Sequence, residues 1–249
     1  MLVLFYDICH IMYTFDVSLF YNLGMSKCEQ CIVRQFNSLK TLTREELMRV
    51  SACKTGKIIK KGEVIFKEGD TLNGIYCVRD GVCKMSKLSE NGKDQVVKLV
   101  VKGGMMGQRS LVSGETANLS AVAINDMQIC FIPKQEILND LQKNSNFSMD
   151  VLKKMAQDLR DADDTVVDMA QKTVKQRMAE TLIYISKKFG HDANGFLNIT
   201  LSREDFASIV GTATESAIRI LSLFKKEGLI STSGKQIKIE DEQGLMRIE

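Results

Sequence analysis

The sequence predicts an α+β fold in three parts: a barrel or sandwich of short strands, a long helix, and a pair of short helices followed by a hairpin. Glycines separate short apolar runs between about residues 57 and 133, as in all-β domains. After Pro133, the only proline, apolar residues recur at spacings of three and four, which is a helical period. Near the C-terminus, Gly211 separates two amphipathic segments. A chain of 249 residues is long enough for two modest domains with real cores.

The β-rich part contains apolar runs at residues 64–66, 75–78 and 95–101. Asn91-Gly92 lies between alternating segments, and this dipeptide is a strong signal for a two-residue hairpin turn. No period of 20–50 residues repeats, which argues against a solenoid.

The long helix carries a narrow apolar stripe of heptad spacing, with Lys, Asp, Arg and Gln around it. A seam this narrow suits a partner helix better than a broad core face. We therefore expect a parallel two-stranded coiled coil that makes the protein a homodimer; a single helix packed on its own domain is the alternative. The seam consists of Leu152, Met155, Leu159, Ala162, Val166 and Met169.

The segment 201–229 has the pattern of a helix-turn-helix. Ser202 and Asp205 form a capping box for the first helix, Gly211 allows the tight turn, and Thr212 or Thr214 can cap the second helix. The start of such a second helix can contact base edges in the major groove of double-stranded DNA. Candidate DNA-contacting residues are Thr214, Glu215, Ser216, Ile218, Arg219 and Lys225. Residues 229–239 alternate around Gly234, which predicts the hairpin of a winged helix.

Overall charge adds little, because a net charge of +3 is weak support for nucleic-acid binding. DNA binding must therefore depend on local geometry. No catalytic Ser-His-Asp or Cys-His arrangement, phosphate loop or acid–base carboxylate pair is visible, so we do not expect an enzyme.

Residues 1–24 contain no Lys or Arg, and they lack the basic region and cleavage site of a signal peptide. Asp7, His10 and Asp16 interrupt any membrane span. We expect translation to begin at Met25, with 1–24 as a non-native or flexible extension; a real N-terminal arm is the alternative. The seven cysteines are odd in number and irregularly spaced in a chain without an export signal, which indicates a reducing cytoplasm and free or metal-bound thiols. We expect no membrane as a partner.

Four segments together resemble the Crp/Fnr family of bacterial transcription regulators, nearer its Fnr-like branch than its cAMP-binding branch. They are residues 59–70, 75–81, 130–133 and 201–229, and the resemblance extends from Cys28 to Glu249.

This resemblance implies a cyclic-nucleotide-binding-type β-roll, a dimerisation helix and a winged helix-turn-helix. It also implies a homodimer that binds a palindromic operator, contacts RNA polymerase, and responds to a signal received in the β-roll. The expected domains are 25–145, 146–172 and 173–249. A cyclic-nucleotide-binding module that does not bind DNA is the alternative function.

In the family's recognition helix a Glu and an Arg four residues later contact a G·C-containing core, and these positions match Glu215 and Arg219. Ile218 between them can press on a thymine methyl, while Thr214 and Ser216 hold phosphates. Lys225 can also contact phosphate or can simply be a solvated helix end.

The resemblance places a ligand pocket at Gly107, Gln108, Arg109, Ser110 and Asn118. The family's ribose-binding Glu is replaced by Gln108, and its phosphate-binding Arg-Ser by roughly Asn118-Leu119. Strand alternation would send Arg109 to the opposite face. Without a buried arginine, cyclic phosphate loses its charge-assisted partner, so cAMP is disfavoured.

The Fnr branch uses an N-terminal Cys-x-x-Cys, a third Cys six residues later and a fourth just before Ile-Pro to hold an iron–sulfur cluster that senses oxygen or nitric oxide. Cys28, Cys31 and Cys130 match, but the third position is Asn37, a poor iron ligand.

Cys53, Cys77 or Cys83 can substitute for the missing ligand only if the fold brings one of them close. A thiol redox switch at Cys28 and Cys31, haem, another small ligand, or simply isolated buried thiols are the alternatives. Zinc is disfavoured because only one Cys-x-x-Cys pair exists.

Overall fold

The computed structural model describes residues 27–90 and 92–248, and these form two compact units. The first unit contains residues 27–83 and 100–155, and the second contains 84–99 and 156–248. The expected N-terminal extension, 1–24, lies outside the described residues, as does Asn91. In the described part of the chain, no helix is long and apolar enough to cross a membrane.

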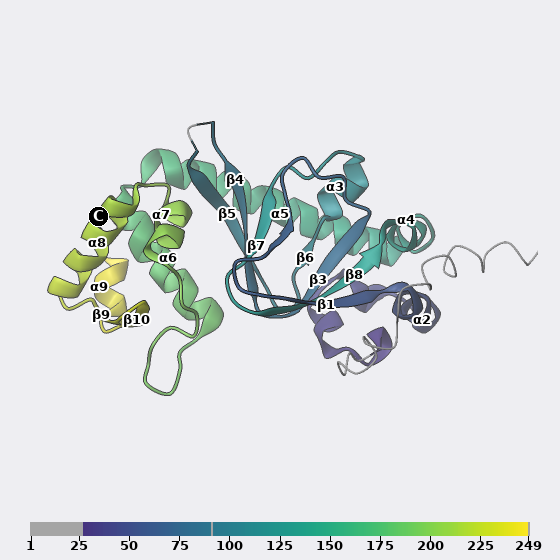
Figure 1. Cartoon of the computed structure of the whole chain (residues 1–249), viewed down its shortest axis with the longest axis horizontal. Coiled ribbons are helices and arrows are strands. Elements are labelled where there is room, and N and C mark those ends of the chain that lie inside the picture. Colours follow the sequence, from purple (N-terminus) through teal and green to yellow (C-terminus); the bar gives the residue numbers. More distant parts are fainter. Residues whose placement is uncertain (1–26, 91, 249) are drawn as a thin grey trace, which may run out of the picture. The chain divides into compact units, whose positions relative to one another are not determined.

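Two four-stranded sheets form the β-roll that the sequence predicts (Figure 1). In spatial order, the strands of the first sheet are β1 (Thr55–Ile59), β8 (Met127–Pro133), β3 (Gly74–Asp80) and β6 (Met105–Met106). Those of the second are β2 (Val64–Phe66), β7 (Ser120–Ala123), β4 (Val82–Leu88) and β5 (Asp94–Val101). The ends of β4 and β5 are joined by a hydrogen bond from the Ser89 N–H to the Lys93 carbonyl, 2.9 Å.

Helices cover one face of the β3–β8 pair. They are η3 (Cys28–Gln30), η4 (Ile32–Phe36), η5 (Ser38–Thr41), α2 (Arg44–Cys53), α4 (Lys134–Lys143) and the first turns of α5 (Ser145–Gln171). Ile75 and Ile132, which are register partners on β3 and β8, pack in one buried cluster with Leu47 of α2 and Phe147 of α5. Sequence inspection did not anticipate the helices of residues 28–53, although Val33, Phe36, Leu39 and Leu42 recur at three-residue spacing. Burial against this sheet face stabilises them.

The long helix α5 spans 27 residues and begins and ends one residue earlier than the expected 146–172. The next helix, α6 (Val174–Phe189), starts after a capping box formed by Thr173 and Gln176. The two helices are therefore separate elements, although the functional domain boundaries remain a prediction.

The C-terminal head has the expected winged helix-turn-helix elements. They are α7 (Arg203–Val210), α8 (Thr214–Lys226), β9 (Ile230–Ser233), β10 (Gln236–Ile239) and a final short helix, α9 (Glu242–Met246). Ser233 and Gln236 are register partners, so Gly234 and Lys235 form a two-residue turn. The buried core of this head contains Met178, Leu182, Ile185, Phe206, Leu221 and Phe224.

Candidate functional site

The first helix of the helix-turn-helix is fixed by the predicted capping box. The Ser202 Oγ accepts a hydrogen bond from the Asp205 N–H, and the Asp205 Oδ2 accepts one from the Ser202 N–H, both 3.0 Å. Gly211 ends α7 in the left-handed conformation at φ 68°, which a side chain adopts only with strain. The turn between the two helices is therefore set by local sequence.

The expected cap of α8 was wrong. Ala213 is the N-cap residue and offers no side-chain acceptor, while Thr214 is already the first helical residue. The Thr212 N–H donates to the Ala207 carbonyl at 3.0 Å, because Thr212 completes the C-terminal turn of α7. The first N–H groups of α8 are thus left without a side-chain cap, and such groups favour an anion such as phosphate.

The exposed face of α8 contains most of the candidate DNA contacts. Glu215, Ile218, Arg219 and Lys225 are exposed, and Thr214 and Ser216 are half-buried. The opposite face packs into the head through Ala217, Leu221 and Phe224. Among the described residues, no ion pair within 4 Å joins Glu215 to Arg219, so neither side chain is engaged by the other. Their contact with bases remains a prediction.

The apolar seam of α5 is exposed in the single chain. Leu152, Leu159 and Val166, spaced seven residues apart, are 56%, 64% and 68% exposed. Met155 and Met169 are half-buried, and Ala162 is exposed. Seven-residue spacing of exposed apolar side chains is the pattern of a coiled-coil seam without its partner.

The residues of the expected effector pocket adopt a different local structure from the one assumed. Gln108–Ser113 forms helix α3, so the argument from strand alternation about Arg109 was wrong. Gly107, the N-cap residue, has φ 93°, and this left-handed turn starts the helix.

The side chains of this segment have different surroundings. Arg109 is exposed and lies 3.8 Å from the Glu115 carboxylate, and Asn118 is exposed. The buried Ser110 Oγ donates to the Thr116 carbonyl at 3.3 Å, and Gln108 is half-buried. This arrangement supplies no buried guanidinium for a cyclic phosphate.

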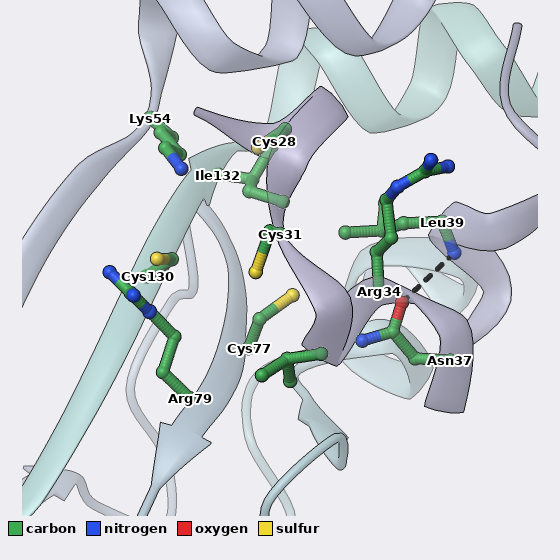
Figure 2. Close-up of a pocket in the computed structure, with 11 residues that line it drawn as sticks. Cys28, Cys31, Arg34, Asn37, Leu39, Lys54, Cys77, Arg79, Cys130 and Ile132 are labelled. Carbon is green, nitrogen blue, oxygen red and sulfur yellow. Dashed lines mark hydrogen bonds between the residues drawn. The ribbon is translucent and has the colours of Figure 1, made fainter. Parts of the chain in front are cut away.

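The fold brings four cysteines into one pocket. Cys28 and Cys31 come from the N-terminal 3-10 segment, Cys77 from β3 and Cys130 from β8. Figure 2 shows the sulfur atoms of Cys31 and Cys77 pointing toward each other, with Cys130 on the same side as Arg79. The pocket is narrow and partly open to solvent.

Strand pairing explains the presence of Cys77. Cys77 and Cys130 are Cα partners in the antiparallel β3–β8 ladder. Directly opposite residues in such a ladder point to the same face, about 5 Å apart at Cβ. Sequence inspection gave Cys77 only as a conditional substitute. The alternation of β3 indicates only which face of the strand Cys77 shares with its neighbours. The register that pairs Cys77 with Cys130 joins residues 53 positions apart, so it cannot be deduced from local sequence.

The N-terminal pair is held over this strand pair by a backbone contact. The Cys28 N–H donates to the Ser51 Oγ of α2 at 3.0 Å. Cys28, Cys77 and Cys130 are buried and Cys31 is half-buried, and none of the described cysteines forms a disulfide. Cys53 and Cys83 do not line the pocket; the buried Cys83 thiol instead contacts the Met106 sulfur at 3.2 Å.

Burial raises the pKa of the Cys28, Cys77 and Cys130 thiols above the ordinary value, most strongly for Cys77. The neighbouring thiols add to this effect on Cys77. Lys54 opposes it at Cys28 and Cys130, and Arg79 does so at Cys130. These three buried thiols therefore favour the protonated form and react slowly with oxidants, since the thiolate is the reactive form.

Asn37, at the position of the family's third cysteine, has a structural role. Its Oδ1 accepts a hydrogen bond from the Leu39 N–H at 3.0 Å, which caps η5 (Figure 2). The residue still lines the pocket. Within residues 27–90 and 92–248, no three His, Cys, Asp or Glu side chains are placed to hold a single metal ion.

Comparison with known protein families gives two matches along the chain. The cyclic nucleotide-binding domain matches residues 57–144, and the Crp-like helix-turn-helix domain matches residues 176–248. Among curated proteins, the chain is 29% identical to the anaerobic regulatory protein of Haemophilus influenzae, over 89% of this chain and 87% of that protein. It is 28% identical to the fumarate and nitrate reduction regulatory protein of Escherichia coli K12, over 89% of each.

Solved structures show the same fold. FixK2 from Bradyrhizobium japonicum superposes with a TM-score of 0.70 at 24% identity, over 79% of this chain and 97% of that one. A Crp/Fnr-family regulator from Eubacterium rectale superposes with a TM-score of 0.70 at 19% identity, over 84% of this chain and 95% of that one.

Proposed function

We propose a function for this chain as a member of the Crp/Fnr family of DNA-binding transcription regulators, which are not enzymes. It is a homodimer on a palindromic operator, and a redox, oxygen or nitric oxide signal at the thiol pocket controls it. The observation that carries the sensing role is the convergence of Cys28, Cys31 and Cys130 in one pocket. As a DNA-binding regulator it works in the cytoplasm, with RNA polymerase as a further partner.

The exposed seam of α5 supports the homodimer. Leu152, Leu159 and Val166 place a continuous apolar stripe in solvent, and a parallel second copy would bury it. A two-fold dimer presents two α8 helices to successive major grooves, about one turn of DNA apart, which requires a palindromic site. Glu215 and Arg219 are the proposed base-reading residues.

An iron–sulfur cluster fits the donor set of the pocket. Thiolates are the usual ligands of such clusters, and the pocket gathers thiols from three separate segments beside two cationic side chains, Lys54 and Arg79. A bound cluster would supply a redox-active centre that reacts with oxygen or nitric oxide.

The chain's own residues would transmit the change. Cys28 is tied to Ser51 of α2, and α2 packs in the same buried cluster as Phe147 and Val151 of α5. A shift of the 28–31 segment therefore acts on the start of the dimer helix. A two-state helix biased by a ligand is a common switching element in regulators.

A thiol switch at Cys28 and Cys31 is the second candidate, favoured by their Cys-x-x-Cys spacing. It is the weaker one, because burial suppresses the thiolate form of Cys28.

Anaerobic purification with an ultraviolet–visible spectrum, iron and acid-labile sulfide tests the sensing role. We expect a broad cluster absorption that air bleaches and that is lost in Cys28→Ser and Cys130→Ser. A sharp Soret band would instead indicate that the cofactor is haem. A colourless, iron-free dimer that still binds DNA would remove the cluster and leave the thiol switch or another small ligand.

A gel shift with the native upstream DNA tests the regulator itself. The wild-type protein should retard this DNA, and Glu215→Ala combined with Arg219→Ala should abolish the shift. A wild-type protein that fails to bind any double-stranded DNA from its own upstream region would contradict the proposal.

A further inference from the structure

We infer that Cys77, together with Cys28, Cys31 and Cys130, completes a four-cysteine site for an iron–sulfur cluster, in place of the ligand that is missing at Asn37. This inference rests on the proposed cluster but concerns which residue of this chain supplies the fourth sulfur.

Backbone register gives the first argument. Because β3 and β8 pair with Cys77 opposite Cys130, their side chains share the face that η3 and η4 cover. The Cys28-x-x-Cys31 segment brings its two sulfurs over the same face, and all four residues line one pocket. The usual cluster set of four thiolates is therefore present without any residue from position 37.

The other cysteines do not offer an equivalent arrangement. Cys83 lies on β4 in the second sheet, is fully buried and contacts the Met106 sulfur. Cys53 is at the last position of α2 and does not line the pocket. Asn37 lines it, but its side-chain oxygen is engaged by the Leu39 N–H. Among the described candidates, Cys77 alone is both in the pocket and a strong sulfur donor.

Charge gives the second argument. Four thiolates outweigh the positive charge of a cubane core, so a loaded site is anionic and needs nearby cations in a buried setting. Lys54 and Arg79 line the pocket on the side of Cys130, and both interact electrostatically with it (Figure 2). If the pocket only held neutral cysteine thiols of the core, two cations among its lining residues would have no charge to balance.

The test is anaerobic reconstitution with ferrous iron and sulfide, followed by iron and sulfide counts per chain and by electron paramagnetic resonance of the reduced protein. Cys77→Ser is the test variant and Cys83→Ser is the matched control, since both remove one buried strand thiol. We expect the wild type and Cys83→Ser to bind about four irons per chain. Cys77→Ser should retain about one tenth of this iron or less. The loss of even an outer-shell partner lowers metal affinity by about 10- to 100-fold.

A rescue variant separates ligand loss from misfolding. Asn37→Cys adds a thiol at another residue of the same pocket, so Cys77→Ser combined with Asn37→Cys should recover cluster content. Circular dichroism and the gel shift report whether Cys77→Ser has kept its fold.

The outcomes distinguish the two proposals. A wild type that takes up no cluster would overturn both the cluster proposal and this inference. A wild type that takes it up while Cys77→Ser matches it in iron content, spectrum and lifetime in air would overturn this inference alone. Loss in Cys77→Ser with rescue by Asn37→Cys would support it.

Discussion

Cys77 of β3 and Cys130 of β8 are direct partners in an antiparallel ladder, and their side chains meet the N-terminal Cys28-x-x-Cys31 segment in one pocket. Cys130 belongs to the cysteine pattern of the Fnr branch, whereas Cys77 lies outside that pattern. The position that matches the third cysteine of the Fnr branch, 37, is occupied by an asparagine that caps a 3-10 helix. The sulfur donors of the pocket are therefore distributed differently from what the motif alone indicates.

Removing the charge of Arg79 should lower the reduction potential of a bound cluster. Arg79 lines the pocket and its positive charge acts on Cys130. Reduction adds negative charge, which a nearby cation stabilises, so Arg79→Gln should shift the midpoint to a more negative value. Arg109→Gln is the control, because Arg109 is exposed on α3 and does not line the pocket. Equal midpoint potentials for the two variants in potentiometric titrations would show that the charge of Arg79 does not stabilise the reduced cluster.

A charge in the seam should separate the dimer. Leu159 is 64% exposed in the single chain, so Leu159→Glu leaves the protomer fold intact. In a coiled coil the new carboxylate would be buried without a partner, at a cost of roughly 3–5 kcal/mol for each copy. Light scattering should give a monomer, and operator affinity should fall about 100-fold or more because the second half-site no longer contributes.

Gln157→Glu adds the same charge two residues away, at an exposed position outside the seam, and should remain dimeric. A Leu159→Glu protein that is still dimeric and binds DNA normally would show that the seam is misassigned.

Truncating Arg219 should reduce sequence-specific binding without reducing stability. Arg219 is exposed on α8, so Arg219→Ala should change the free energy of unfolding by no more than about 0.5 kcal/mol. The loss of a bidentate contact to guanine should cost about 1–3 kcal/mol at each half-site. Fluorescence anisotropy with operator and scrambled DNA measures the difference.

Ser222→Ala, another exposed position of α8, is the control and should bind like the wild type. Arg219→Lys keeps the charge but loses the planar fork, so it should bind DNA with reduced sequence preference. Equal discrimination by all three variants would place base recognition elsewhere.

Removing the capping serine should loosen the first helix of the head. The Ser202 Oγ accepts the Asp205 N–H, so Ser202→Ala leaves that donor without its acceptor and costs about 1 kcal/mol. Amide exchange in the first turn of α7 should become about fivefold faster. Ser222→Ala serves again as the control, and unchanged exchange in both variants would mean that the cap adds little to local stability.

Local patterns predicted the elements that depend on neighbouring residues. The capping box at Ser202 and Asp205, the turn at Gly211 and the hairpin at Gly234 were confirmed, since each depends on side chains a few positions apart. The exceptions were also local. Position 213 and not 212 or 214 is the cap of α8, and Gln108–Ser113 is helical where strand alternation was assumed.

The sequence by itself determined the family, the order of β-roll, long helix and winged helix-turn-helix, and the heptad stripe of α5, because these are encoded in periodicity and short-range turn chemistry. Only the tertiary structure decided which cysteines meet. The choice of Cys77 over Cys53 and Cys83 follows from the register of β3 on β8 and from the packing of residues 28–31 on that strand pair. Contacts between segments far apart in the chain are set by the burial of the whole core, and no local pattern records them.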